Sequence, residues 1–103
     1  MSEQLGAGLC ALVVDDEVVV CEFLSRFLEG FGVGVVTASS LGAARVRADS
    51  QDYDLFFVDK HLPDGSGVEL VKELTERLYE HEVVMITAQA TVDSAVAAIR
   101  LGV

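Results

Sequence analysis

Four short apolar segments constrain the fold of this chain more than any other feature of its sequence. They are continuous, rich in β-branched side chains, and span residues 9–14, 33–37, 55–58 and 83–87. Continuous apolar runs of this length, unlike alternating ones, are typical of strands that are covered on both faces, as in a parallel sheet. The sequence therefore predicts four buried strands.

Helical patterns follow each of these segments. Apolar residues recur at helical spacing within 20–28, 41–48, 68–78 and 92–99. Gly30 suits the end of the first helix, and Ser40 can cap the second helix, which Gly42 weakens. The alternation of strand and helix predicts right-handed βαβ units in a doubly wound α/β fold, a parallel sheet between two layers of helices.

Length, composition and charge set broad limits. The 103 residues fit one domain, and 51% hydrophobic against 23% charged residues predicts a globular chain. Seventeen acidic and seven basic residues give a net charge of −10, which disfavours direct contact with nucleic acid. The chain has no apolar stretch of about 18 residues and no basic segment at its start, so we expect a cytoplasmic protein that does not enter a membrane.

The cysteines and histidines do not suggest a zinc site. Cys10 and Cys21 form no C-x-x-C pair, and His61 and His81 are far apart in dissimilar contexts. We expect two buried thiols.

Polar side chains stand at the ends of three of the predicted strands. Asp15 and Asp16 follow the first apolar run, Asp59 follows the third, and Thr87 ends the fourth. In a doubly wound sheet the functional site lies beyond the carboxyl ends of the strands, so we expect these residues at one edge. The alternative for Asp59 is a strand terminator before the turn at 63–65. The alternative for Thr87 is a residue chosen for its β propensity.

Three converging carboxylates need a cation or a proton. Two unit charges about 4 Å apart repel by roughly 4 kcal/mol at an effective dielectric near 20. Oxygen ligands alone select a hard ion, and a few carboxylates completed by water suit Mg²⁺ better than Ca²⁺. Mg²⁺ beside an exposed carboxylate suits phosphoryl transfer, with Asp59 as the nucleophile and the Thr87 hydroxyl near a phosphoryl oxygen. A purely structural acidic rim is the alternative.

Three stretches of the sequence resemble one known family. "LVVDDE", "LFFVDKHLPDGSG" and "VVMITAQATVDSAVAAIRLG" are similar to the response-regulator receiver domain of two-component signalling. The last stretch is most similar to receivers of nitrogen-regulation activators, which are transcription regulators. The resemblance implies a flavodoxin-like fold, a five-stranded parallel sheet of order 2-1-3-4-5 flanked by five helices.

The resemblance also implies a role for each residue at the predicted edge. Asp59 would be the phospho-acceptor, Asp16 a direct Mg²⁺ ligand, and Asp15 a ligand through a metal-bound water. The backbone carbonyl of His61 would complete the protein ligands, and Thr87 would be the switch hydroxyl.

The family pattern continues beyond the last matching stretch with a fifth strand, which carries an aromatic residue and an invariant lysine, and a fifth helix. These elements are not among the 103 residues, and neither Lys60 nor Lys72 takes the place of that lysine. We therefore expect a C-terminally truncated receiver domain over residues 1–103 with strand order 2-1-3-4. Its exposed apolar edge at 83–86 predicts a homodimer, or exchange of a strand or helix between chains.

Three functions remain open from the sequence. The first is a signalling switch, not an enzyme in its own right, that takes a phosphoryl group from a sensor histidine kinase onto Asp59 and assists its own phosphorylation and dephosphorylation. A downstream effector domain or protein would read the altered surface near Thr87 and 91–100. The second is a non-phosphorylated receiver that acts as an interaction module. The third is a Mg²⁺-dependent aspartyl-phosphate phosphohydrolase, disfavoured because Asp59-Lys60-His61 lacks the D-x-D pattern.

Overall fold

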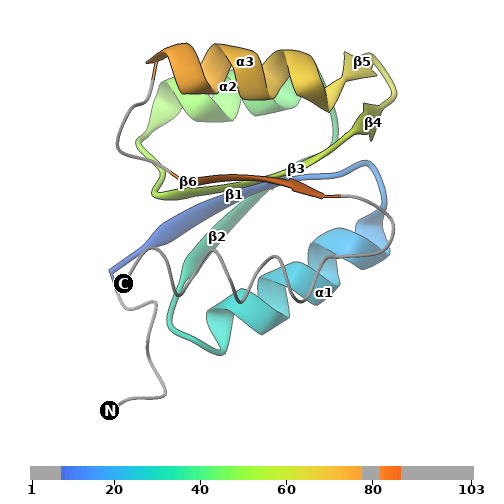
Figure 1. The fold of residues 1–103 in the computed structure, drawn as a ribbon. Helices are drawn as coiled ribbons and strands as arrows, with labels where there is room; N and C mark the ends of the chain where they lie inside the picture. Colours follow the sequence, from blue (N-terminus) through green and yellow to red (C-terminus); the bar gives the residue numbers. More distant parts are fainter. Residues whose placement is uncertain (1–7, 78–81, 87–103) are drawn as a thin grey trace.

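The computed structural model describes residues 8–77 and 82–86 and shows a parallel sheet between helices (Figure 1). The strands of the sheet lie in the order β2-β1-β3-β6. They are β1 (Cys10–Val14), β2 (Gly34–Ala38), β3 (Leu55–Asp59) and β6 (Glu82–Ile86). All three pairings are parallel. Because β6 corresponds to the fourth strand predicted from the sequence, the predicted order 2-1-3-4 is confirmed.

Within the described residues, three helices cover the two faces of the sheet. Helix α1 (Val18–Glu29) lies on one face, and α2 (Leu41–Ser50) and α3 (Gly67–Arg77) lie on the other (Figure 1). This arrangement confirms the three-layer doubly wound fold. Over the described residues, no helix combines the length and apolar character that a membrane crossing requires.

The core is divided by the sheet into two clusters, because successive residues of a strand face opposite sides. Val13 and Phe57 pack with Leu24 of α1 on one face. On the other face, Leu12 and Phe56 belong to the cluster that includes helices α2 and α3. Both faces of β1 and β3 are buried, which explains why their sequences are apolar without alternation.

A short hairpin between β3 and α3 was not expected from the sequence. Its strands are β4 (His61–Leu62) and β5 (Gly65–Ser66), and they pair antiparallel. The segment contains Pro63, Asp64 and Gly65, which predict a turn, but two-residue strands are too short to leave a pattern. The hairpin leads directly from the end of β3 to the start of α3.

The helix ends differ in detail from the prediction. Gly30 does follow α1, but its backbone is right-handed, with φ −63°, and the left-handed glycine is Gly32, with φ 87°. The N–H groups of Phe31, Gly32 and Val33 all donate to carbonyls in the last turn of α1, so the helix ends over three residues. Ser40 is confirmed as the cap of α2, since its Oγ accepts the N–H of Ala43 at 3.1 Å.

Part of the prediction lies outside the described residues. This applies to Thr87, to the helix expected over 92–99 and to its cap at Thr91. Strand β6 stands at the end of the described sheet, and exchange of strands or helices between chains at this edge stays a prediction.

Candidate metal and phosphoryl site

Three carboxylates meet at the carboxyl edge of the sheet. Asp15 and Asp16 directly follow β1, and Asp59 is the last residue of β3. The two strands are neighbours, with Val14 opposite Val58, so both chains leave the sheet at the same level. One carboxylate oxygen from each of the three aspartates lies within 4.8 Å of the other two. The convergence predicted from the strand pattern is therefore present.

The backbone after β1 is shaped by Asp15. Its N–H donates to the carbonyl of Ala38 at 3.0 Å, which extends the pairing of β1 with β2 by one residue. Its Oδ1 accepts the N–H of Glu17 at 2.9 Å, a local turn that leads into α1. As a result, Asp15 is only 4% exposed, whereas Asp16 is exposed to solvent.

Burial sets the electrostatics of the pair. The pKa of Asp15 is raised to about 6, chiefly by loss of hydration and also by the charges of Asp59 and Asp16, while the N–H of Glu17 acts in the opposite direction. A raised carboxyl pKa means that the charged form is held at a cost. A bound cation would remove that cost, so the site favours a positive ligand.

The end of the site formed by Asp59 is shaped by the β4–β5 hairpin. The N–H of His61 donates to Oδ1 of Asp59 at 3.2 Å. His61 pairs with Ser66 across the hairpin, and the N–H of Gly67 donates to the carbonyl of Lys60 at 2.9 Å. The backbone of His61 is therefore fixed two residues beyond Asp59, while its side chain is exposed.

Gly67, the first residue of α3, lies against the main chain of Asp59. A Cβ at this position would overlap the carbonyl oxygen of Asp59, and would also crowd Val58. Only glycine fits where the helix begins so close to the strand end. Nothing in the sequence alone indicated that Gly67 contacts Asp59.

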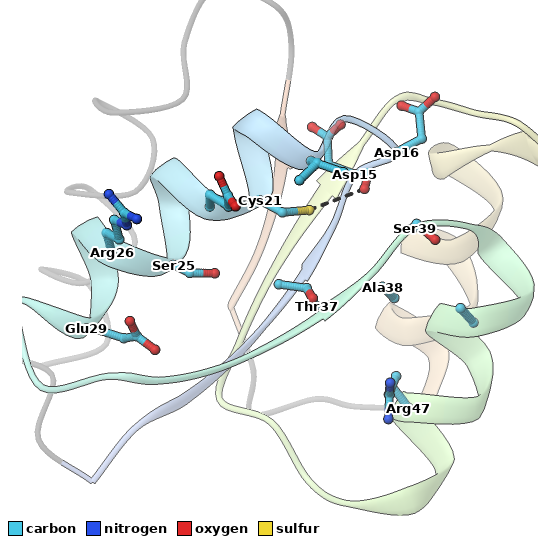
Figure 2. Close-up of a pocket in the computed structure, with 13 residues that line it drawn as sticks. Asp15, Asp16, Cys21, Ser25, Arg26, Glu29, Thr37, Ala38, Ser39 and Arg47 are labelled. Carbon is cyan, nitrogen blue, oxygen red and sulfur yellow. Dashed lines mark hydrogen bonds between the residues drawn. The ribbon is translucent and has the colours of Figure 1, made fainter.

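A hollow of about 520 Å³ opens beside the acids, between α1 and α2 (Figure 2). Asp15 and Asp16 line one end of it, and its other lining residues include Thr37 of β2, Arg26 of α1 and Arg47 of α2. Asp59 is not among the lining residues, so the hollow adjoins the acidic cluster without containing all of it.

The thiols were expected to be buried, and the structure corrects this. Both Cys10 and Cys21 are free and half-buried. The Sγ of Cys21 donates to the carbonyl of Asp15 at 3.3 Å (Figure 2), and burial raises the pKa of this thiol, which keeps its proton available for that bond.

The donor set fits a hard divalent cation. Within the residues that the structure describes, the cluster consists of carboxylates alone, without a thiolate or imidazole ligand. Carboxylate and carbonyl oxygens are the ligands that Mg²⁺ and Ca²⁺ prefer, whereas zinc sites use sulfur and nitrogen.

The comparison with protein families decides the classification. The family described as the response regulator receiver domain matches residues 11–103. The chain belongs to this family. The receiver domain is a signalling switch, which agrees with the resemblance seen in the sequence, and the interaction-module and phosphohydrolase alternatives are not favoured.

Individual relatives support the same assignment. The receiver domain is 36% identical over 92 residues to the response regulator protein PilR of Pseudomonas aeruginosa, covering 89% of the chain but 21% of PilR. A Burkholderia pseudomallei response regulator with a phosphorylated aspartic acid, a calcium ion and citrate matches with TM-score 0.74 and 29% identity, over 89% of this chain and 54% of that one. TrrA of Thermotoga maritima, in complex with Mg²⁺-BeF, matches with TM-score 0.71 and 27% identity, over 87% and 80%.

The receiver domain thus spans about a fifth of the curated relative PilR. Of the site residues predicted from the sequence, the structure brings together Asp15, Asp16 and Asp59 and places His61 beside them. Thr87 lies outside the described residues. Sequence reasoning did not identify the contacts of Asp64, described below, because a P-D-G turn signals a turn but not the distant partner of its carboxylate.

Proposed function

We propose that residues 1–103 form a receiver domain that accepts a phosphoryl group on Asp59 from the phosphohistidine of a sensor histidine kinase, with Mg²⁺ held at the same site. Asp15, Asp16, Asp59 and the backbone carbonyl of His61 are the proposed metal ligands. The observation that carries the proposal is the cluster of three carboxylates within 4.8 Å at the end of β1 and β3.

The proposed reaction is a transfer between two residues. A carboxylate oxygen of Asp59 attacks the phosphorus, a P–O bond forms, and the P–N bond to the kinase histidine breaks. The imidazole nitrogen leaves with the electron pair and takes up a proton from solvent. Since the N–H of His61 holds Oδ1 of Asp59, Oδ2 is the proposed nucleophile. Mg²⁺, when bound, offsets the charge that gathers on the phosphoryl oxygens.

The protein positions the reacting group and holds the charges that bind the metal. Asp15 is nearly buried and oriented by the N–H of Glu17, so its carboxylate needs little reorganisation on metal binding. Asp16 is exposed and can follow the ion. The same arrangement would assist attack of water on the acyl phosphate, which resets the switch.

The consequences for partners follow from the family. Phosphorylation adds about two negative charges, and Thr87 with the segment 91–100 is the proposed route by which a downstream effector domain or protein senses them. We propose a cytoplasmic location, and no direct contact of this chain with nucleic acid, in keeping with its net charge of −10.

Intact-mass measurement after incubation with acetyl phosphate and Mg²⁺ tests the proposal. We expect a gain of one phosphoryl group that is absent with EDTA and absent in Asp59→Asn. The matched control is Asp54→Asn, an aspartate at the opposite end of β3, which should retain the gain. Absence of any gain in the wild-type protein would favour the interaction module, and sustained release of phosphate would favour the phosphohydrolase.

A further inference from the structure

The hairpin after Asp59 is attached at its tip to the start of helix α2. Oδ1 of Asp64 accepts the N–H of Leu41 at 2.8 Å, and Oδ2 accepts the N–H of Gly42 at 3.0 Å. These are the first two residues of α2, whose N–H groups have no acceptor within the helix. Ser40 accepts the next available N–H, that of Ala43. The start of α2 is therefore capped partly by Ser40, the residue before the helix, and partly by Asp64 of the hairpin.

Packing at the same place supports this attachment independently. Leu62 of β4 is 9% exposed and belongs to the same buried cluster as Leu41. Gly65 has φ 150°, and a Cβ there would lie 2.6 Å from Cδ1 of Leu41. The backbone of the hairpin at Gly65 thus lies close to the side chain of Leu41. This apolar contact stands beside the two hydrogen bonds of Asp64.

The other end of the hairpin is attached to the phosphoryl site. The N–H of His61 holds the carboxylate of Asp59, and the N–H of Gly67 closes the hairpin on the carbonyl of Lys60. The segment between these two anchors has only Asp64 as its polar contact to α2 among the bonds described. A loop that is held at both ends has less freedom to move the backbone of His61 away from Asp59.

We propose that Asp64 is a positioning residue for the metal and phosphoryl site: by binding the start of α2, it holds the hairpin that sets the His61 backbone beside Asp59. The inference rests on the proposed function. It concerns a residue that touches neither the metal ligands nor the phosphoryl group.

The charge of Asp64 agrees with this role. The N–H groups of Gly42 and Leu41 lower the pKa of its carboxyl, and Arg45 lowers it further. Asp64 is consequently ionised at neutral pH, and its charge faces the positive end of the α2 dipole.

A helix cap without any effect on the site is the alternative, and two control variants separate the interpretations. Ser40→Ala removes the other side-chain acceptor at the same helix start but leaves the hairpin attached. Arg45→Ala breaks the contact between α2 and Glu73 of α3 and also leaves the hairpin attached. If Asp64 only stabilises α2, Asp64→Ala and Ser40→Ala should act alike on the site.

The first measurement is the affinity for Mg²⁺ by calorimetric titration, with no phosphodonor present. We expect Asp64→Ala to raise the Kd about tenfold, Asp64→Asn, which keeps one acceptor oxygen, to raise it less, and both control variants to stay within about twofold of the wild type. A tenfold change corresponds to about 1.4 kcal/mol. Equal Kd values for Asp64→Ala and Ser40→Ala would overturn the inference.

The second measurement is the initial rate of phosphorylation by acetyl phosphate as a function of Mg²⁺ concentration. Asp64→Ala should raise the Mg²⁺ concentration at half-maximal rate and leave the maximal rate nearly unchanged. A fall in the maximal rate alone would contradict a role in placing the metal ligands. Amide hydrogen exchange should rise over 61–66 in Asp64→Ala but not in Ser40→Ala, and equal exchange in the two variants would also contradict it.

The two proposals fail in different ways. If the wild-type protein neither binds Mg²⁺ nor gains a phosphoryl group, the proposed function is wrong and the role of Asp64 is wrong with it. If the wild-type protein does both and Asp64→Ala matches Ser40→Ala, only the role of Asp64 is wrong.

Discussion

Helices α1 and α2 both begin at the carboxyl edge of the sheet, but they are held there by different forces. The residue before α1, Glu17, makes no side-chain capping bond to the described residues, and the helix is anchored by Leu24 and Leu28, which are fully buried. The start of α2 carries Gly42, and Ser40 and Asp64 together cap three of its N–H groups. Packing anchors the first helix, and hydrogen bonds at the start anchor the second.

The aspartates near the two helix starts sharpen this contrast. Asp15 and Asp64 both accept backbone N–H groups, yet burial raises the pKa of Asp15 to about 6, whereas the N–H groups of Gly42 and Leu41 lower the pKa of Asp64. The two carboxylates therefore accept the same kind of hydrogen bond, but their pKa values are shifted in opposite directions. Near α1 a buried charge is held at a cost in stability, whereas near α2 an exposed charge stabilises the start of the helix.

The largest effect should come from the packing of α1. Leu24→Ala removes a side chain with 0% exposure, and we expect the free energy of unfolding to fall by about 2–5 kcal/mol because a cavity remains. Urea denaturation followed by circular dichroism measures this. Val18→Ala, at a position of the same helix that is 70% exposed, should change little. A small effect of Leu24→Ala would contradict an anchor made by packing.

The next effect concerns Asp15 and pH. Because its folded pKa is raised above its unfolded value, the folded state binds the proton more tightly, so stability contributed by this group is present below about pH 4 and lost as pH rises to about 6. In EDTA at pH 7, Asp15→Asn should therefore increase the free energy of unfolding by about 2 kcal/mol, after allowance for screening.

The difference between Asp15→Asn and the wild type should shrink toward zero at pH 4. Denaturant titrations at pH 4 and pH 7 measure it, and the isosteric Asp16→Asn, at an exposed neighbour, is the control. A gain from Asp15→Asn that is the same at both pH values would show that burial of the charge is not its cause.

A smaller effect is expected from the cap of α2. Ser40→Ala leaves the N–H of Ala43 without its acceptor, and we expect a loss of about 1 kcal/mol. Glu17→Ala, the matched change before α1, should cost close to nothing, since Glu17 caps no N–H group among the described residues. Equal losses in the two variants, measured by thermal unfolding, would remove the contrast between the helix starts.

The smallest effect should come from the ion pair between α2 and α3. Arg45 and Glu73 meet through two bonds, of 3.1 and 2.7 Å, but their side chains are 43% and 39% exposed. Solvent screens such pairs, so Arg45→Ala should lower the melting temperature less than Ser40→Ala does. The difference from the wild type should narrow further in high salt. A loss larger than that of Ser40→Ala would make the ion pair the main anchor of α2.

Much of the fold could be predicted because its determinants are local. The continuous apolar runs of β1 and β3 reflect burial on both faces, and the acids that end them, Asp15 and Asp59, could be assigned to one edge by register alone. The position of Asp64 could not, because its partners Leu41 and Gly42 are 23 and 22 residues away and donate through backbone N–H groups. Backbone donors leave no trace in side-chain identity.

The different solvent exposure of Asp15 and Asp16 could not be predicted from the sequence either. Asp15 and Asp16 are identical in sequence and adjacent, yet Asp15 is 4% exposed and Asp16 is exposed to solvent. The difference arises because the N–H of Asp15 still pairs with Ala38 of β2, which keeps that residue within the sheet. The different exposure of the two residues thus depends on the register between β1 and β2. The resemblance to receivers implied a role for each residue but did not explain why only one of them is buried.

The contact between Gly67 and Asp59 has a mechanical consequence. A Cβ at Gly67 would overlap the carbonyl of Asp59, and the N–H of Gly67 donates to the carbonyl of Lys60. The end of β3 and the first turn of α3 are therefore in direct contact. A shift of the main chain at Asp59 would therefore displace the first turn of α3. The helix would carry that displacement toward its other end.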